Sequence, residues 1–220
     1  IGAAIAVTVG TSGLAVLKSL ALLVLTLYGS LIVLVLFVFL PIALFARVPI
    51  RAFWKYVKEP WLIAFSTASS EAALPLAMQN LAKFGLPKRI IAFVLPTGYS
   101  FNLDGSTLYL AIASVFAAQA GGIEMTFGQQ LLMMLTLMLT SKGVAAVPRA
   151  SLVILSGALA MFNLPLEAVA VILGVDAIMD MGRTSINLMG NCLATAVMAR
   201  WEGEFPVTPG VPAEGVRGEA

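Results

Sequence analysis

Residues 171–200, VILGVDAIMDMGRTSINLMGNCLATAVMAR, carry the polar pattern that decides the fold and the class of function. A helix of this length rises about 45 Å, which is enough to cross the roughly 30 Å hydrocarbon layer of a membrane with some tilt. Charges at this depth are costly, so they usually face a cavity and mark a substrate or ion pathway. The alternative is a structural Asp–Arg pair that joins two helices. The polar residues share an arc of roughly 100° and are Asp176, Asp180, Arg183, Thr184, Asn187 and Asn191.

The composition is that of an integral membrane protein. Of the 220 residues, 60% are hydrophobic and 11% are charged, whereas soluble domains are about 25% charged. The net charge of +2 and the lack of a basic run give no sign of nucleic-acid binding. The chain has no histidine and a single cysteine, Cys192. This excludes imidazole chemistry, an internal disulfide and a cysteine metal cluster.

The two ends and the first long segment differ in composition. Residues 1–13 are small and apolar, and we expect them to end a truncated preceding span, so that the chain lacks an N-terminal part. Residues 14–49 hold one apolar stretch that is long enough for one tilted transmembrane span and too short for two. Residues 202–220 are rich in Pro, Gly and Glu, which predicts a disordered cytoplasmic tail.

Residues 50–87 are predicted to form a first re-entrant hairpin. Basic residues precede and follow residues 59–82, which contain none. If this stretch crossed the membrane, one basic cluster would lie outside, against the positive-inside tendency. STASSEAALP at residues 66–75 suits a hairpin tip that is buried in protein or lines a cavity. The alternative is a soluble loop with an amphipathic helix.

Residues 88–121 are predicted to be a discontinuous span, because PTGYSFNLDGS interrupts them at residues 96–106. A break at mid-depth frees backbone carbonyls, which together with the carboxylate of Asp104 suit a small cation. The N-terminus of a half-helix suits an anion. The alternative is a Pro/Gly kink whose polar groups are satisfied.

Residues 122–163 repeat the hairpin design, with short apolar arms around SKGVAAVPRA at residues 141–150. We predict a second re-entrant hairpin that enters from outside, followed by a substrate-binding span at residues 164–201. Paired interrupted segments are a sequence sign of a secondary transporter site. The expected fold is an all-α integral membrane protein with long spans, two re-entrant hairpins, discontinuous helices and an inverted repeat of 50–119 against 124–200.

Four motifs carry a family resemblance: STASSEAALP, NLDGS, SKGVAAVP and GVDAIMDMGRTSINLMGN. In order and spacing they resemble the dicarboxylate/amino acid:cation symporter family, the family of the glutamate transporters, over about residues 12–201. The likeness is greatest to bacterial proton-coupled glutamate/aspartate symporters. It implies that five earlier spans are missing and that the full protein is a multi-pass homotrimer of the cell membrane. It also implies elevator-type transport, with the second hairpin as external gate.

The resemblance implies roles for the stripe. Arg183 would bind the substrate's side-chain carboxylate through its planar fork, and Asp180 would accept its ammonium. Asp176 would orient helices. Since a dicarboxylate has no ammonium, Asp180 favours glutamate or aspartate over the alternative, a C4-dicarboxylate such as succinate, fumarate or malate. The other implied substrate contacts are Ser70, Ser106, Thr184, Asn187 and the backbone near Val147.

The coupling ion is expected to be H⁺ or Na⁺, with no other cofactor. Asn191 stands where sodium-coupled members have an aspartate, Leu103 replaces a methionine, and Ala68 replaces an arginine of some prokaryotic aspartate transporters. These differences favour a proton and leave sodium open. A Na⁺ ion would lie at Gly98, Asn102, Asn187 and Asn191. The full set of expected cation-binding residues is Gly98, Ser100, Asn102, Asp104, Ser141, Asn187 and Asn191.

Two other classes of protein fit less well. An intramembrane aspartyl protease could use Asp104 with Asp176 or Asp180, but such an enzyme needs two facing carboxylates that share a proton. Arg183 and the neighbouring amides do not suit that chemistry. A channel would show rings of like charge or repeated filter loops. We therefore expect a transporter rather than an enzyme, a channel or a passive structural bundle.

Overall fold

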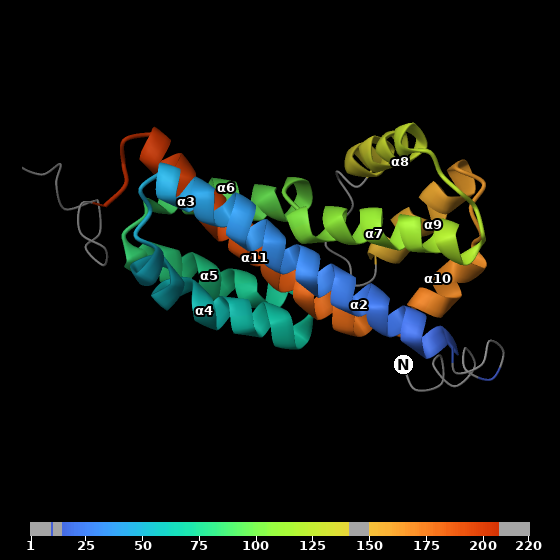
Figure 1. Cartoon of the computed structure of the whole chain (residues 1–220). Coiled ribbons are helices and arrows are strands. Elements are labelled where there is room, and N and C mark those ends of the chain that lie inside the picture. The colour runs from blue at the N-terminus through green and yellow to red at the C-terminus, as the bar shows by residue number, and fades with distance from the viewer. Residues whose placement is uncertain (1–9, 11–14, 141–149, 207–220) are drawn as a thin grey trace, which may run out of the picture. The chain divides into compact units, whose positions relative to one another are not determined.

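The computed structural model describes residues 10, 15–140 and 150–206, and these contain helices and no β-strand (Figure 1). The prediction of an all-helical fold is confirmed for these residues. The chain divides into two compact units. The first unit comprises Ile1–Leu31 and Asp104–Arg183, and the second comprises Ile32–Leu103 and Thr184–Ala220.

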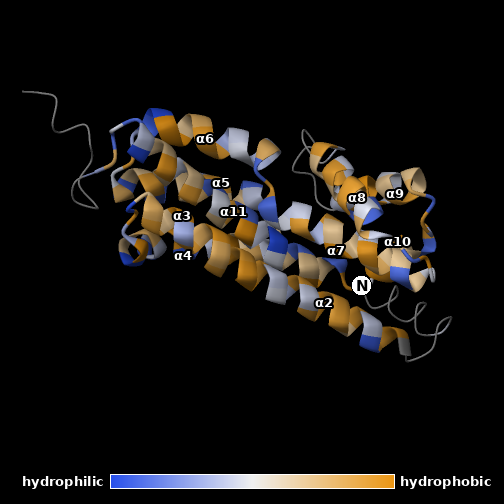
Figure 2. Cartoon of the chain, turned by 45° about the horizontal axis from the view of Figure 1, so that its top comes forward, coloured by the Kyte–Doolittle hydropathy of each residue, from blue (hydrophilic) through white to orange (hydrophobic). Residues whose placement is uncertain are grey.

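Two helical stretches are long and apolar enough to cross a membrane, namely Val16–Phe45 and Lys88–Ala120. Two shorter apolar helices are Phe127–Thr140 and Ser151–Met161. Hydrophobic residues predominate along α2, α8 and α9 (Figure 2). On α2, side chains such as Leu25, which is 67% exposed, point away from the protein. Large exposed apolar surfaces of this kind suit contact with lipid.

The first long helix changes its winding midway. Helix α2 (Ala15–Leu34) continues through a π-helical segment, η1 (Val35–Phe39), into α3 (Leu40–Phe45). Pro41 explains the change, because its ring clashes with the carbonyl four residues earlier, which belongs to Phe37 within η1. The sequence predicted the length of this apolar stretch but not the π-helical segment.

In the second unit, α4 (Ile50–Thr67) and α5 (Ser70–Phe84) pack against each other, and α6 (Lys88–Phe101) packs on α5. The turn between α4 and α5 lies in STASSEAALP. Ala68 ends α4 with a left-handed φ of 49°, and the Ser69 hydroxyl caps α5 by accepting a 3.3 Å hydrogen bond from the Ala72 N–H. That this pair re-enters a membrane from one side stays a prediction.

In the first unit, α7 (Asp104–Ala120) contacts α8 (Phe127–Thr140), α9 (Ala150–Met161) and α10 (Glu167–Ile172). Helices α8 and α9 also contact each other. Residues 141–149, the expected tip of the second hairpin, lie outside the described residues. So do residues 1–9, 11–14 and 207–220, which cover most of the expected N-terminal segment and tail.

The expectation of one unbroken helix over residues 171–200 is wrong. Helix α10 ends at Ile172, a turn occupies residues 173–175, and α11 begins at Asp176 and ends at Trp201. Gly174 lowers the helix propensity of this turn. The carboxylate of Asp176 in the first turn of α11 interacts favourably with the helix N-terminus. The break precedes the polar stripe, so α11 carries all six stripe residues.

Candidate functional site

A charged cluster lies in the first unit and consists of Tyr109 on α7 with Asp176, Asp180 and Arg183 on α11. The Arg183 side chain is only 2% exposed, and that of Asp180 is 14% exposed. Arg183 Nε donates a 2.8 Å hydrogen bond to Asp180 Oδ1. Arg183 Nη1 lies 3.6 Å from Asp176 Oδ1. One buried guanidinium therefore interacts with two carboxylates.

Tyr109 contacts both the acidic and the basic part of the cluster. Its hydroxyl donates a 3.1 Å hydrogen bond to Asp176 Oδ1. The guanidinium carbon of Arg183 lies 4.2 Å from the centre of its ring, a cation–π contact. Tyr109 is not among the residues predicted from the sequence. The available signal was its spacing, because it shares the buried face of α7 with Ser106 and Ala113, three residues before it and four after it.

Gly105 brings α7 close to the backbone of α11. A Cβ atom at this position would lie 2.6 Å from the backbone oxygen of Arg183 and 3.0 Å from its Cα. No side chain fits there without a backbone shift. The glycine of NLDGS therefore permits a close approach of two helices in the first unit, in addition to weakening the helix as the sequence suggested.

An amide pair, Asn102 and Asn191, lies in the second unit. Asn102 leaves the helix at the end of α6, with φ −118° and ψ 76°. Its Nδ2 donates to Asn191 Oδ1 at 3.1 Å, and Asn191 Nδ2 donates back to the Asn102 carbonyl at 3.3 Å. Asn191 is fully buried. A Cβ atom at Gly98 would overlap its amide, so only glycine fits beside the pair.

The remaining predicted residues lie at several places. Thr184 and Asn187 are buried on α11 in the second unit, and Ser106 is buried on α7 in the first. Ser70 begins α5. The cation-site residues Ser100 and Asp104 lie near the end of α6 and at the start of α7. Ser141 and Val147 lie outside the described residues.

The structure therefore joins Asp180 with Arg183 and Asp176, and Asn102 with Asn191 beside Gly98. Asp180 and Arg183 belong to one helix, so this pair is not the structural Asp–Arg pair joining two helices that the sequence left as an alternative. Asp176 does link two helices, through Tyr109, and the helix-orienting role expected of it stays a prediction. The substrate and cation roles of these residues stay predictions.

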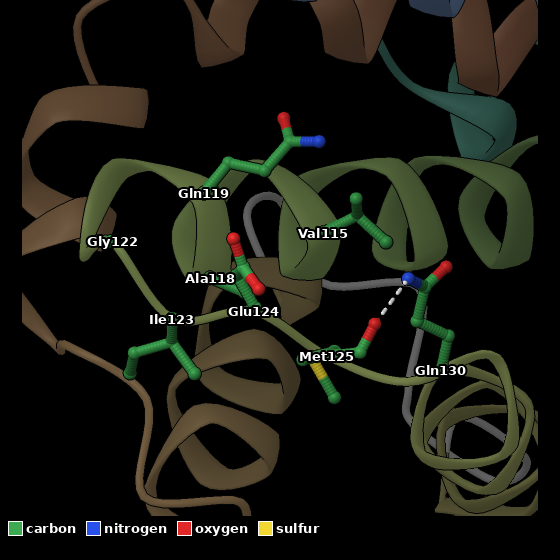
Figure 3. A pocket seen from close by; sticks show the side chains of 8 residues that line it. All are labelled: Val115, Ala118, Gln119, Gly122, Ile123, Glu124, Met125 and Gln130. Atoms are coloured by element: carbon green, nitrogen blue, oxygen red, sulfur yellow. Dashed lines mark hydrogen bonds between the residues drawn. The ribbon is translucent and has the colours of Figure 1, made fainter.

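Two cavities in the first unit involve other residues. One, of about 1000 Å³, is mostly apolar and lies along α2, α7 and α10. The other, of about 520 Å³, lies at the turn between α7 and α8, where Gln130 donates to the Met125 carbonyl (Figure 3). Gln119 and Glu124 also line it. Neither lining includes a predicted substrate or cation residue among those that the structure describes.

Within residues 15–140 and 150–206, no group of three or more His, Cys, Asp or Glu side chains is placed to hold a metal ion. A sodium ion at the residues expected from the sequence would instead depend on amide and carbonyl oxygens. The geometry of the amide pair opposes this, because Asn191 Nδ2 points an N–H group at the Asn102 carbonyl. A cation would have to displace that hydrogen bond.

The sequence of residues 1–201 matches the model of the sodium:dicarboxylate symporter family. The chain belongs to this family. The family is described as one of symporters. The resemblance carried by the four motifs is confirmed.

Similar proteins differ in the substrates that their names give. The chain is 49% identical over 203 residues to the proton/sodium-glutamate symport protein of Bacillus subtilis strain 168, covering 92% of this chain and 47% of the relative. It is 45% identical over 203 residues to the proton/glutamate-aspartate symporter of Escherichia coli K12, covering 92% and 46%. It is 41% identical over 219 residues to the C4-dicarboxylate transport protein of Bacillus subtilis, covering 97% and 51%. The chain spans about half the length of these curated relatives.

Proposed function

We propose that this chain carries the substrate-binding region of a secondary active symporter that takes up glutamate or aspartate with a proton. The observation that carries the proposal is the ion pair between the buried Arg183 and the partly buried Asp180 on one helix. Without substrate, the two side chains neutralise each other. An acidic amino acid offers an ammonium to Asp180 and a carboxylate to Arg183. It can therefore replace one internal ion pair with two external pairs.

The same exchange disfavours a dicarboxylate. Separating a buried ion pair is costly unless each charge gains a new partner. Succinate could occupy Arg183, but it would leave Asp180 without an ammonium and place a like charge near it. Hydrogen bonds to charged groups contribute about 1.5–3 kcal/mol, so we expect roughly 10- to 100-fold selectivity for the amino acids. C4-dicarboxylate uptake is the second candidate, because relatives with that name are 41–42% identical.

Charge balance supports cotransport of a cation. The charged cluster has one more carboxylate than guanidinium, and an acidic amino acid adds a further net negative charge. Uncompensated charge is costly in a buried site, so a proton or metal cation should accompany the substrate. The amide pair is neutral and its members bond to each other. We therefore place the coupling proton on a carboxylate of the charged cluster rather than a sodium ion at Asn191.

The wider architecture forms part of the same proposal. Helices α4 and α5 would form the first re-entrant hairpin, and α8 and α9 would form the arms of the second, which acts as the external gate. The full-length protein would be a homotrimer in the cell membrane with a cytoplasmic C-terminus, working by an elevator motion. Family membership supports these assignments.

The test is ligand binding to the purified chain in lipid nanodiscs. Thermal unfolding is measured with L-aspartate, L-glutamate or succinate, with choline replacing sodium, at mildly acidic and at neutral pH. A ligand at 100 times its Kd stabilises the folded state by about 2.7 kcal/mol. We expect both amino acids to stabilise the chain without sodium, more strongly at acidic pH, and succinate to bind at least tenfold more weakly.

Other outcomes would change the proposal in defined ways. Equal affinity for succinate and aspartate would favour the C4-dicarboxylate reading. Stabilisation that requires sodium would refute the assignment of the coupling ion. No stabilisation by any of the three ligands would refute substrate binding by this chain.

A further inference from the structure

Tyr28, on α2, makes contacts with α11 that none of the predicted roles explains. Its hydroxyl donates a 2.7 Å hydrogen bond to the backbone carbonyl of Ile178. The backbone of Gly182 lies near the same side chain. Residues 178 and 182 are four apart, the spacing of one helical hydrogen bond. The side chain of Tyr28 thus contacts the turn of α11 that contains Asp180.

The ring of Tyr28 packs against the same turn. A Cβ atom at position 182 would lie 2.9 Å from Tyr28 Cζ, 3.1 Å from Cε1 and 3.2 Å from Leu31 Cδ1. Glycine within a helix costs about 1 kcal/mol relative to alanine. Its presence at position 182 is explained by the ring, because a larger residue would push α11 away from α2.

These contacts fix the turn that presents Asp180 and Arg183. Side chains project outward from a helix at fixed angles, so a rotation of α11 about its own axis would turn Asp180 and Arg183 by the same angle and misdirect both charges. The hydroxyl limits rotation through its hydrogen bond to the Ile178 carbonyl, and the ring limits how closely the two helices approach at Gly182. Both constraints act within the first unit.

We propose that Tyr28 is a positioning residue for acidic amino acid binding, which holds residues 178–182 of α11 so that Asp180 and Arg183 meet the two charged ends of the substrate. The inference rests on the proposed function, since it concerns the same two charges. It assigns no substrate contact to Tyr28 itself.

The first test compares Tyr28→Phe with Tyr56→Phe in the full chain. Tyr56 lies on α4, and its ring packs on Phe84 in the second unit. Each variant loses only a hydroxyl. We expect Tyr28→Phe to lower the affinity for L-aspartate three- to tenfold and to lower the aspartate-to-succinate affinity ratio. Tyr56→Phe should leave both unchanged. A purely structural role would lower the unfolding temperature without changing the ratio.

The second test uses the packing of Gly182. Gly182→Ala should lower aspartate affinity at least tenfold, whereas Gly29→Ala should have little effect, because a Cβ at position 29 meets no atom within 4 Å. In a Tyr28→Ala background, Gly182→Ala should cause less than a twofold further loss. This non-additivity measures the contact directly. If Gly182→Ala fails to fold, recovery of folding in the double variant supports the contact, and failure of both variants opposes it.

The outcomes separate this inference from the proposed function. If the unmodified chain binds no acidic amino acid, both are wrong. If it binds aspartate and Tyr28→Phe binds with the same affinity and ratio as Tyr56→Phe, only the positioning role is wrong.

Discussion

The charged cluster and the amide pair are two polar groups, each with buried and partly buried members, that both include residues of α11 and differ in the interactions that hold them. In the first, Arg183 is bonded to Asp180 and stacked on Tyr109. In the second, Asn102 and Asn191 exchange two hydrogen bonds. The first contains ionised groups on one helix, and the second contains neutral groups from two helices of one unit.

This difference decides which of the two can respond to a charged ligand. An ion pair can be replaced by two new ion pairs without leaving a buried charge uncompensated. A reciprocal amide pair has no net charge, and opening it would leave buried donors and acceptors without partners, at about 1–3 kcal/mol each. The charged cluster is therefore suited to exchange, and the amide pair is suited to fixing the break between α6 and α7.

The largest effect should come from removing the guanidinium. Arg183→Ala removes the guanidinium from the buried carboxylate of Asp176 and the partly buried one of Asp180, and breaking a buried ion pair typically destabilises a protein by about 3–5 kcal/mol. It should also abolish aspartate binding. Chemical unfolding and calorimetry measure the two effects. Arg51→Ala, at an exposed position, should change stability by less than about 0.5 kcal/mol. Retained aspartate affinity in Arg183→Ala would remove the cluster from the site.

The next effect should be a change of selectivity. Asp180→Asn removes the proposed partner of the substrate ammonium, so aspartate affinity should fall by about 10- to 100-fold, equivalent to 1.5–3 kcal/mol. Succinate affinity should rise, because the repelling charge is gone. Competition binding with both ligands measures the ratio.

Asp176→Asn provides the matched control for this change. It removes one negative charge, as Asp180→Asn does, but at a residue that bonds to Tyr109. It should lower stability without inverting the aspartate-to-succinate ratio. The same inversion in both variants would mean that total charge, rather than the position of Asp180, sets the selectivity.

The sequence predicted the polar stripe of α11 and the break after Phe101, but not the contacts that other helices make with α11. The stripe on α11 follows from helical periodicity, and the interruption after Phe101 follows from the Pro, Gly and Asn content of residues 96–106. The ion pair between Asp180 and Arg183 follows from their i,i+3 spacing. The prediction from the sequence assigned substrate-binding roles to both residues and did not include this pair.

The parts that were missed depend on tertiary packing. Tyr109 and Tyr28 reach α11 from helices distant in sequence, and neither residue type signals such a contact by itself. The sequence gives no reason for a glycine at position 182, and the structure supplies one, because the Tyr28 ring packs against this position. The turn at residues 173–175 reflects a balance between the weak helix propensity of Gly174 and the favourable start of α11 at Asp176. Periodicity alone does not resolve that balance.

The expectation that the amide pair does not bind sodium can be tested by introducing a carboxylate at position 191. Asn191→Asp removes the N–H donor to the Asn102 carbonyl and buries a carboxylate, so stability without sodium should fall by about 1–3 kcal/mol. Carboxylate and carbonyl oxygens suit a hard cation, and sodium should therefore restore stability and begin to promote aspartate binding. Thermal unfolding in sodium and in choline measures this. Asn163→Asp, in an exposed turn, should show no sodium effect, and an equal response in the two variants would point to general salt screening.

The smallest effect should separate the two contacts of Tyr109. Tyr109→Phe removes the hydrogen bond to Asp176 but keeps the ring beneath Arg183, so it should cost about 0.5–1.5 kcal/mol of stability. Tyr109→Leu removes both contacts and also leaves part of the volume of this buried ring empty, so its additional loss should exceed the cation–π contribution of about 0.5–2 kcal/mol. If the ring holds Arg183 in place, aspartate affinity should fall more in Tyr109→Leu than in Tyr109→Phe. Equal affinities would mean that Asp180 alone is enough to orient the guanidinium, and that Tyr109 contributes to the cluster only through Asp176.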